Sequence, residues 1–282
     1  MDENLKHLIS LLDDSNPLVG ANVLAELLKY QDKLPELIKE LQESHDPVVR
    51  QRIHQLQVIA AIRKQRHDFA QQVRSNSLSL FDILLGIHLL WYDSDPPEEI
   101  IASWKKHIKT AKKFNPISLT TLGRFMRKQE YAAGQPDQFR ADHYCLGSVM
   151  DERIGAEVIL CCLAAITAAS FKVDTRIGSA GKRFYVVDGS GMALCPARNW
   201  KCSPLPPSIH LFFWNRQSLV KHVLSMLFLY AVASDSFRYI NTIGSCLAEI
   251  ATGKDKLDFL PYPYNKPTNP DTPASTPDTE TE

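Results

Sequence analysis

The sequence lacks a hydrophobic run long enough to cross a membrane. Two apolar stretches stand out, Val223–Ala233 and Ile154–Phe171. The first is shorter than the roughly 20 residues that a spanning helix needs, and the second contains Glu157. A buried core helix explains both stretches. The first residues, Met1–Asn4, are acidic and lack the apolar segment of a signal peptide. We therefore expect a soluble cytoplasmic protein with no membrane partner.

The sequence also lacks a net charge. It has 32 Lys and Arg residues against 32 Asp and Glu residues, so the formal charge is +0. A neutral chain has no long-range field that gathers polyanions. This balance argues against nucleic acid as the main partner.

One local run of positive charge departs from that balance. The segment 98–114 is expected to be a helix, and it contains five lysines: Lys105, Lys106, Lys109, Lys112 and Lys113. Such a run is typical of a phosphate-binding surface or of the solvated face of an amphipathic helix. We favour the solvated face, because Glu98 and Glu99 are nearby and the whole chain is neutral. A nucleic-acid or regulator-binding module over Trp104–Lys128 stays as an alternative, and steep salt dependence of binding would identify it.

The residue patterns of common metal and nucleotide sites are missing as well. The six cysteines show no framework spacing, and the chain contains no C-x-x-C, H-E-x-x-H, phosphate-loop or G-x-G-x-x-G motif. The nine histidines are scattered without ligand spacing. We expect reduced thiols, no cofactor and no metal ion.

The N-terminal part, residues 1–75, has a helical pattern that repeats. The segment Leu8–Val19 matches Ile38–Val49 at an offset of 30 residues, and each copy contains an Asx-Pro turn. Helix–turn–helix units of this kind are typical of HEAT-like repeats, which stack because one unit cannot bury its apolar face alone. A plain helical bundle is the alternative interpretation.

Residues 76–210 combine helices with strands. Apolar spacing predicts helices over 78–91, 98–114 and 119–131, and a further helix that follows Gly155 and is apolar on nearly all sides. An extended segment at 171–178, a strand at 183–187, a tight turn at 188–191 and a returning strand at 192–195 follow it. This order predicts an α+β fold that is mostly helical, with a small antiparallel sheet.

The C-terminal part contains a helical hairpin and then a polar tail. We expect helices at 216–233 and 237–251 within a segment that spans residues 211–260. Residues 261–282 are rich in Pro and Thr and contain too few apolar residues to offset the entropy of ordering. We expect this tail to be disordered.

The order of these segments resembles the SirB-type transglutaminase-like proteins. The resemblance rests on four short segments: His143–Met150 as the lead-in, Arg153–Gly155 at the start of the central helix, Gly181–Phe184 in place of a Gly-His-Phe strand, and Cys195-Pro196 in place of an Asp-Pro turn. It implies a transglutaminase-like (papain-like) core, preceded by HEAT-like helices and followed by a TPR-like hairpin. The order and spacing match over most of the chain, but no single motif is intact.

The resemblance also implies that the catalytic triad of that fold is lost. The thiol of such a site lies at a helix N-terminus, where free N–H groups lower its pKa, and a histidine and an aspartate activate it. In this chain Glu157 occupies the position of the thiol, Lys182 or Arg183 that of the histidine, and Cys195 that of the aspartate. We therefore expect a non-catalytic protein that binds or scaffolds a protein partner. We also expect Glu157 to form a buried ion pair with Lys182 or Arg183.

The alternative is a cysteine-dependent transglutaminase or protease-like enzyme with a relocated nucleophile. Cys161 and Cys162 are expected to be core residues, because Leu160, Leu163 and Ala164 are their neighbours in sequence. Cys195 and Cys202 are near a loop and are expected to be easier to reach. An enzyme of this kind would show one rapidly alkylated cysteine with a depressed pKa.

Overall fold

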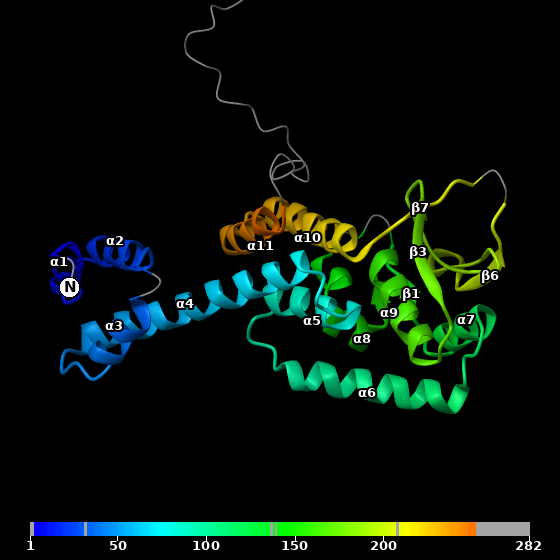
Figure 1. The fold of residues 1–282 in the computed structure, drawn as a ribbon, viewed down its shortest axis with the longest axis horizontal. Coiled ribbons are helices and arrows are strands. Elements are labelled where there is room, and N and C mark those ends of the chain that lie inside the picture. The colour runs from blue at the N-terminus through cyan, green and yellow to red at the C-terminus, as the bar shows by residue number, and fades with distance from the viewer. Residues whose placement is uncertain (1–2, 31–32, 136–137, 139, 207–208, 252–282) are drawn as a thin grey trace, which may run out of the picture. The chain divides into compact units, whose positions relative to one another are not determined.

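The computed structural model describes residues 3–30, 33–135, 138, 140–206 and 209–251, so the predicted disordered tail lies outside the described residues. The fold is α+β, mostly helical, with a small antiparallel sheet (Figure 1). The chain divides into two compact units, residues 1–69 and 70–282. Residues 76–210 and the helical hairpin thus belong to one unit. In the part of the chain that the structure describes, no helix is both long and apolar enough to cross a membrane.

The first unit contains two helix–turn–helix pairs. Their helices are α1 (Glu3–Ser10), α2 (Pro17–Leu27), α3 (Leu34–Leu41) and α4 (Pro47–Arg74), and α4 continues into the second unit. The Asx-Pro turns work as the sequence indicates. The Asn16 side chain accepts from Leu18 N–H at 3.0 Å, and the Asp46 side chain accepts from Val48 N–H at 2.7 Å. The two turns are therefore equivalent at the offset of 30 residues, while the HEAT assignment stays a prediction.

An arginine inside the first unit donates to carbonyl groups of the turn between α1 and α2. Arg52 of α4 is only 9% exposed, and its guanidinium donates to the carbonyl oxygens of Leu11, Leu12 and Asp14. A turn leaves backbone carbonyls outside any helix or strand, and Arg52 supplies hydrogen-bond donors to three of them. The surrounding core contains Leu12, Leu27, Ile53 and Leu56, each at most 1% exposed.

The second unit is built around α9 (Glu157–Ser170), nine of whose residues are buried. Four helices pack on α9, namely α5 (Leu80–Trp91), α6 (Pro97–Phe114), α7 (Leu119–Lys128) and α8 (Leu146–Glu152). Strands β3 (Thr175–Ala180) and β4 (Arg183–Asp188) of the sheet also pack on it. The hairpin of α10 (Arg216–Ala233) and α11 (Phe237–Ile250) packs against α5. Side-chain caps fix several of the starts, with Ser79 accepting from Asp82 N–H before α5 and Ser118 forming a capping box with Thr121 before α7.

The sheet is a five-stranded antiparallel meander with one returning strand. Its order is β6-β5-β4-β3-β7, made from β3 (Thr175–Ala180), β4 (Arg183–Asp188), β5 (Met192–Cys195), β6 (Lys201–Pro204) and β7 (Phe212–Phe213). Val186 pairs with Leu194, and both are fully buried. The alternate residues Tyr185, Val187, Ala193 and Cys195 form a second apolar cluster. Side chains alternate between the faces of a strand, so both faces of the sheet centre are covered.

Several elements differ from the sequence-based expectation. The helix expected over 119–131 ends at Lys128, and Ala132–Ala133 (β1) instead pairs in parallel with Ile154–Gly155 (β2). Gly155 therefore belongs to a strand, and Ala156 is the N-cap of α9. Strands β6 and β7 and helix α8 were not predicted, because they have only two to seven residues and no clear period.

Candidate functional site

The start of α9 brings together two of the four residues singled out from the sequence. Glu157 is the first residue of α9, and its side chain is 15% exposed. Its Oε1 lies 2.6 Å from an Arg183 guanidinium nitrogen, and its Oε2 accepts from the Phe184 backbone N–H at 2.9 Å. Both oxygens of the carboxylate are therefore used to join α9 to the first residues of β4. The pair is only partly buried, because the Arg183 side chain is 52% exposed.

The other two residues occupy different environments. Lys182 is exposed in the turn between β3 and β4. Cys195 ends β5 and is 2% exposed. Burial raises the pKa of the Cys195 thiol and the Glu157 carboxylate adds to the rise, although backbone N–H groups of Arg198 and Ala197 oppose it. Cys195 is thus a buried thiol with a raised pKa, whereas Lys182 is an exposed turn residue.

The thiols near this cluster are poor nucleophiles. Cys161 lies one turn below Glu157 on α9, is fully buried, and has a pKa raised by burial and by the neighbouring Cys162, Cys195 and Glu157. Burial also raises the pKa of Cys162 to about 12 and raises the pKa of Cys145. A thiolate rather than a thiol is the attacking species. These cysteines are therefore buried and stay in the unreactive thiol form.

A second cluster, near the start of α6, contains a serine, a histidine and an aspartate, but its hydrogen bonds are not those of a catalytic triad. His88 is 1% exposed, and its Nε2 lies 3.0 Å from an Asp95 carboxylate oxygen. Its Nδ1 accepts from the Gly147 backbone N–H at 3.3 Å, so the proton is on Nε2 and points to Asp95. Burial lowers the pKa of His88, although Asp95 opposes the change. Both ring nitrogens are occupied, so His88 cannot take a proton from Ser148, which lines the same cleft of about 270 Å³.

The same cleft also exposes carboxylates from three elements. Asp95, Glu99 and Asp151 line it together with His88. Among the described residues, however, no three His, Cys, Asp or Glu side chains gather closely enough to hold a metal ion. The cleft is therefore an acidic surface feature with no metal-binding geometry in this part of the chain.

A buried polar chain crosses the second unit between α6, α9 and the loop before β1. The Arg153 guanidinium donates to the Tyr131 hydroxyl, which lies 3.3 Å from His107 Nδ1. His107 Nε2 lies 3.0 Å from the Thr167 hydroxyl, which donates to the Leu163 carbonyl at 2.8 Å. Because the Thr167 hydrogen is used, His107 must donate through Nε2 and accept through Nδ1. In this series of hydrogen bonds, Arg153 donates to Tyr131, Tyr131 to His107, His107 to Thr167 and Thr167 to the Leu163 carbonyl.

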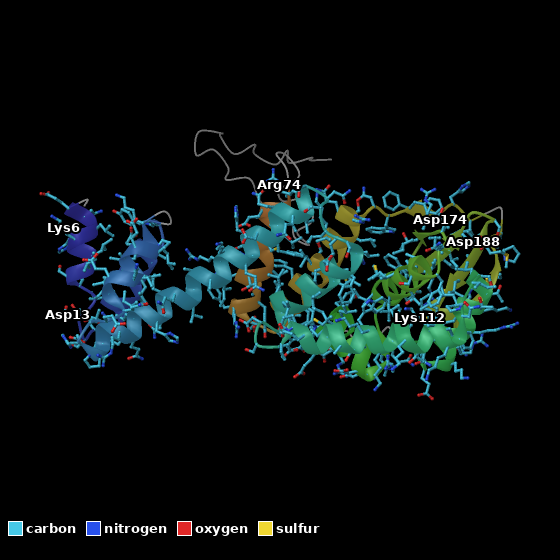
Figure 2. The ribbon with its side chains drawn as sticks, turned by 60° about the horizontal axis from the view of Figure 1, so that its bottom comes forward. Lys6, Asp13, Arg74, Lys112, Asp174 and Asp188 are labelled. Carbon is cyan, nitrogen blue, oxygen red and sulfur yellow. The ribbon has the colours of Figure 1, made fainter. Side chains whose placement is uncertain are left out.

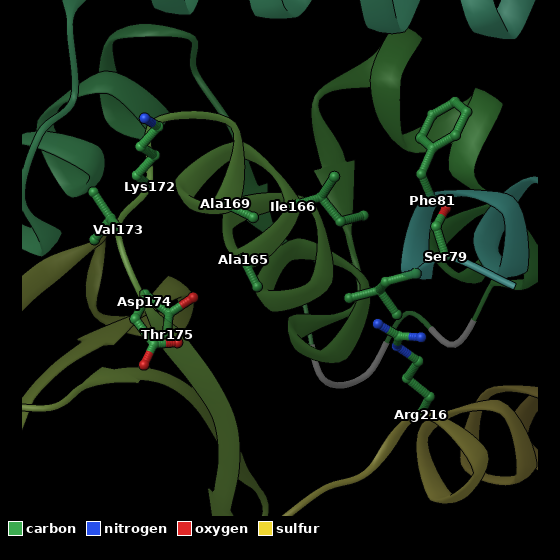
Figure 3. A pocket seen from close by; sticks show the side chains of 11 residues that line it. Ser79, Phe81, Ala165, Ile166, Ala169, Lys172, Val173, Asp174, Thr175 and Arg216 are labelled. Carbon is green, nitrogen blue, oxygen red and sulfur yellow. The ribbon is translucent and has the colours of Figure 1, made fainter. Parts of the chain in front are cut away.

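A groove of about 510 Å³ lies at the C-terminal end of α9 (Figure 3). Its apolar side is formed by Phe81 and by Ala165, Ile166 and Ala169 of α9, while polar groups on its rim are Ser79, Lys172, Asp174, Thr175 and Arg216. Arg216 donates to the Leu78 carbonyl at 3.1 Å, and its guanidinium points toward the apolar side (Figure 3). The α9 residues that line the groove follow Glu157 by 8 to 12 positions, or about 12 to 18 Å along the helix axis.

Sequence reasoning missed this groove. The residues that form it come from α5, α9, β3 and α10, which are far apart in sequence. A helix that is apolar on nearly all sides gives no sign of which side stays open. The exposed strip of α9 is therefore visible only in the folded structure.

Comparison with known proteins gives no relative from which a function can be transferred. No family model, no curated protein and no solved structure matches this chain. Any functional statement must therefore come from the residues themselves.

Proposed function

We propose that the protein is a non-catalytic protein-interaction or scaffolding protein built on a degenerate transglutaminase-like core. The observation that supports this proposal best is the use of Glu157, whose two carboxylate oxygens bind Arg183 and the Phe184 N–H. The residue at the expected position of the nucleophile thus connects α9 to β4 through its hydrogen bonds. The raised pKa values of the buried thiols nearby point the same way.

The groove at the other end of α9 is the surface that we assign to the partner. An extended segment of a partner protein that carries an apolar side chain beside a carboxylate would suit it. The apolar side chain would cover Ile166 and Ala169, and the carboxylate would meet the Arg216 guanidinium, which has donors left after its bond to Leu78. Recognition of this kind combines apolar burial with one charged contact.

The enzyme alternative makes a sharper chemical claim. A relocated nucleophile needs a reachable thiol with a lowered pKa. Cys145, Cys161, Cys162 and Cys195 are buried, and their pKa values are raised. Cys202 is half-buried on β6 and is the most accessible thiol of the six. These properties weigh against the alternative.

Alkylation separates the two functions. We would measure iodoacetamide labelling of the native protein from pH 6 to 9, with mass spectrometry to locate each label. The proposal predicts that Cys202 reacts first, at the rate of an ordinary thiol, and that the buried cysteines react only on unfolding. A cysteine that labels rapidly at pH 6 would establish the enzyme alternative instead.

Site-specific cross-linking tests the groove. A photoreactive amino acid would replace Ala169 in the groove or, as a control, the exposed Ser190 in the turn between β4 and β5. We expect a discrete protein adduct from position 169 in cells, no such adduct from position 190, and loss of the adduct when Arg216→Glu is added. Equal adducts from both positions, or an adduct unaffected by Arg216→Glu, would contradict the assignment.

A further inference from the structure

The C-terminal half of α6, the exposed side of α7 and the start of β6 together present a concentration of positive charge. We call these ten residues the basic surface. All ten are exposed: Lys105, Lys106, Lys109, Lys112, Lys113, Arg124, Arg127, Lys128, Arg198 and Lys201. Figure 2 shows Lys112 among the side chains that project from α6.

The three segments adjoin one another in the fold. The Phe114 ring of α6 lies 5.6 Å from the Phe125 ring of α7, and the Lys128 ammonium lies 5.9 Å from the Phe114 ring centre. A Cβ atom added to Gly123 would lie 2.6 Å from the Trp200 carbonyl, so α7 also touches the residue that precedes β6. The elements that carry the ten charges are therefore neighbours in the fold, and the Lys128 ammonium directly joins α7 to α6.

Acidic residues are absent from these segments. Residues 104–129 and 189–206 contain no Asp or Glu. In the described part of the chain, no ion pair includes a member of the basic surface. The net charge of zero hides this separation, because the balancing carboxylates are elsewhere in the sequence.

The two acidic residues that seemed to compensate the lysines are at the far end of α6. Glu98 and Glu99 are in its first turn, and Lys105 follows Glu99 by six residues, or about 9 Å along the helix axis. That distance is about one Debye length at physiological ionic strength. Only Lys112 and Lys113 lie in the last turn, where the helix dipole favours positive charge. Capping of the dipole thus leaves three of the five α6 lysines unexplained.

The chemistry of this surface selects the partner. The exposed large apolar residue among the segments is Ile117, at 67%, while Trp104 and Phe114 are half-buried. Protein interfaces depend on clusters of aromatic or apolar anchors, and a single exposed isoleucine does not form such a cluster. The apolar side of α6 packs on α5, α8 and α9, so it cannot enter a membrane. Exposed ammonium and guanidinium groups without apolar anchors match the polar, positively charged interfaces that contact nucleic-acid phosphates.

We propose that the basic surface binds the phosphate backbone of double-stranded nucleic acid without base-sequence preference. The lysine and arginine side chains supply positive charges for phosphates, and phosphate contacts carry no base-sequence information directly. This binding is independent of the partner groove at α9, so either proposal can fail alone.

The test measures fluorescence anisotropy of the full chain with 20-base-pair duplexes at several salt concentrations. We expect binding to two unrelated DNA sequences with affinities within threefold of each other. If about four phosphates are neutralised, raising the salt from 50 to 200 mM lowers the affinity by about 100-fold. A duplex RNA arm identifies which duplex the surface prefers, and binding to either one supports the proposal.

A matched pair of charge-reversal variants locates the surface. The triple variant Lys105→Glu, Lys109→Glu, Lys112→Glu is expected to weaken binding at least 30-fold. The control Lys6→Glu, Lys39→Glu, Lys64→Glu changes three exposed lysines outside the basic surface by the same total charge and is expected to weaken binding less than threefold. Replacing the same three α6 lysines by glutamine should weaken binding by an amount between those of the two triple variants. Circular dichroism of each variant checks that it is folded.

Three outcomes overturn the proposal. The first is no duplex binding at 50 mM salt and 50 µM protein. The second is equal weakening in the two triple variants, which shows that only total charge matters. The third is binding to vesicles of phosphatidylserine, or to an acidic polypeptide such as polyglutamate, without binding to duplexes, which assigns the surface to a different class of partner.

Discussion

At the scale of single residues, His107 shows how burial determines a protonation state. Its pKa is lowered to about 4, first by burial and then by the Arg153 charge, which reaches it through Tyr131. A second proton would have to go on Nδ1, which now accepts from Tyr131. The imidazole is therefore neutral in the folded protein over the range in which a free histidine titrates.

This shift makes the folded state sensitive to acid. Above pH 6.5 His107 is neutral in both states and costs nothing. Between pH 6.5 and about 4, His107 is protonated in the unfolded chain but not in the folded chain. The free energy of unfolding therefore decreases as the pH is lowered, by roughly 3 kcal/mol in total for this residue. We predict a shallower fall for His107→Gln, measured by urea unfolding at steps between pH 7 and 4. The exposed His210→Gln serves as control and should keep the wild-type slope.

Glu157 gives a second prediction at this scale. Glu157→Gln keeps an oxygen for the Phe184 N–H but loses the charge that holds Arg183, and because Arg183 is half exposed the cost should be under about 1 kcal/mol. Glu157→Ala also leaves that N–H without its acceptor and should cost about 1–2 kcal/mol. Urea unfolding at pH 7 ranks the two variants. Equal stability of wild type and Glu157→Ala would show that these hydrogen bonds contribute nothing.

Whether a side-chain contact could be predicted from the sequence depends on how far apart its two residues lie in the chain. The pairing of Glu157 with Arg183 could be predicted, because a helix start and the next hairpin strand set both positions. Lys182 could not be separated from Arg183, because one residue of strand register decides which one faces Glu157. The chain from Arg153 to Thr167 was not predicted. Its side chains are joined across 22 to 60 residues of sequence, and their types carry no spacing signal.

At the scale of elements, the contact between α7 and the sheet depends on one glycine. A Cβ atom at Gly123 would lie 2.5 Å from Leu194 Cδ1 and 2.6 Å from the Trp200 carbonyl oxygen. The second neighbour is backbone and cannot move aside without shifting β6. The close packing of α7 on β5 and β6 therefore requires the absence of a side chain at this position.

We predict that Gly123→Ala destabilises the protein by about 1–3 kcal/mol, the usual cost of overpacking, despite the higher helix propensity of alanine. Thermal and urea unfolding measure the change. Gly189→Ala is the matched control, because a Cβ atom there meets nothing within 4 Å. A Gly123→Ala variant as stable as Gly189→Ala would mean that α7 can move away from the sheet without cost.

The elements that the sequence predicted well are those with strong local signals. Apolar periodicity and the turn residues between helices placed α5, α6, α10, α11 and the β4–β5 hairpin within a few residues. β6 and β7 depend instead on pairing with strands already formed, and β6 ends in Pro204. Short pairing-dependent strands have no local pattern of their own.

At the scale of the whole molecule, the chain has two compact units with separate apolar cores. Arg52 acts within the first unit, through the carbonyls of the turn between α1 and α2. Arg52→Met retains much of the side-chain volume but removes those bonds, and we predict a loss of about 2–3 kcal/mol in the first unit. Hydrogen exchange detected by mass spectrometry should show faster exchange before residue 69 and unchanged exchange in α5–α11. Faster exchange in both regions would show that the two units unfold together.

The directional hydrogen bonds around His107 also have a consequence for inheritance. Each of the four side chains in that series gives hydrogen to the next group, so replacing one member in isolation leaves a neighbour with no acceptor or no donor. An evolving protein avoids these unpaired groups only if several of the four residues change together, for instance to apolar residues that fill the same volume. Homologous chains should therefore keep Tyr131, Arg153, His107 and Thr167 as a block or lose them as a block.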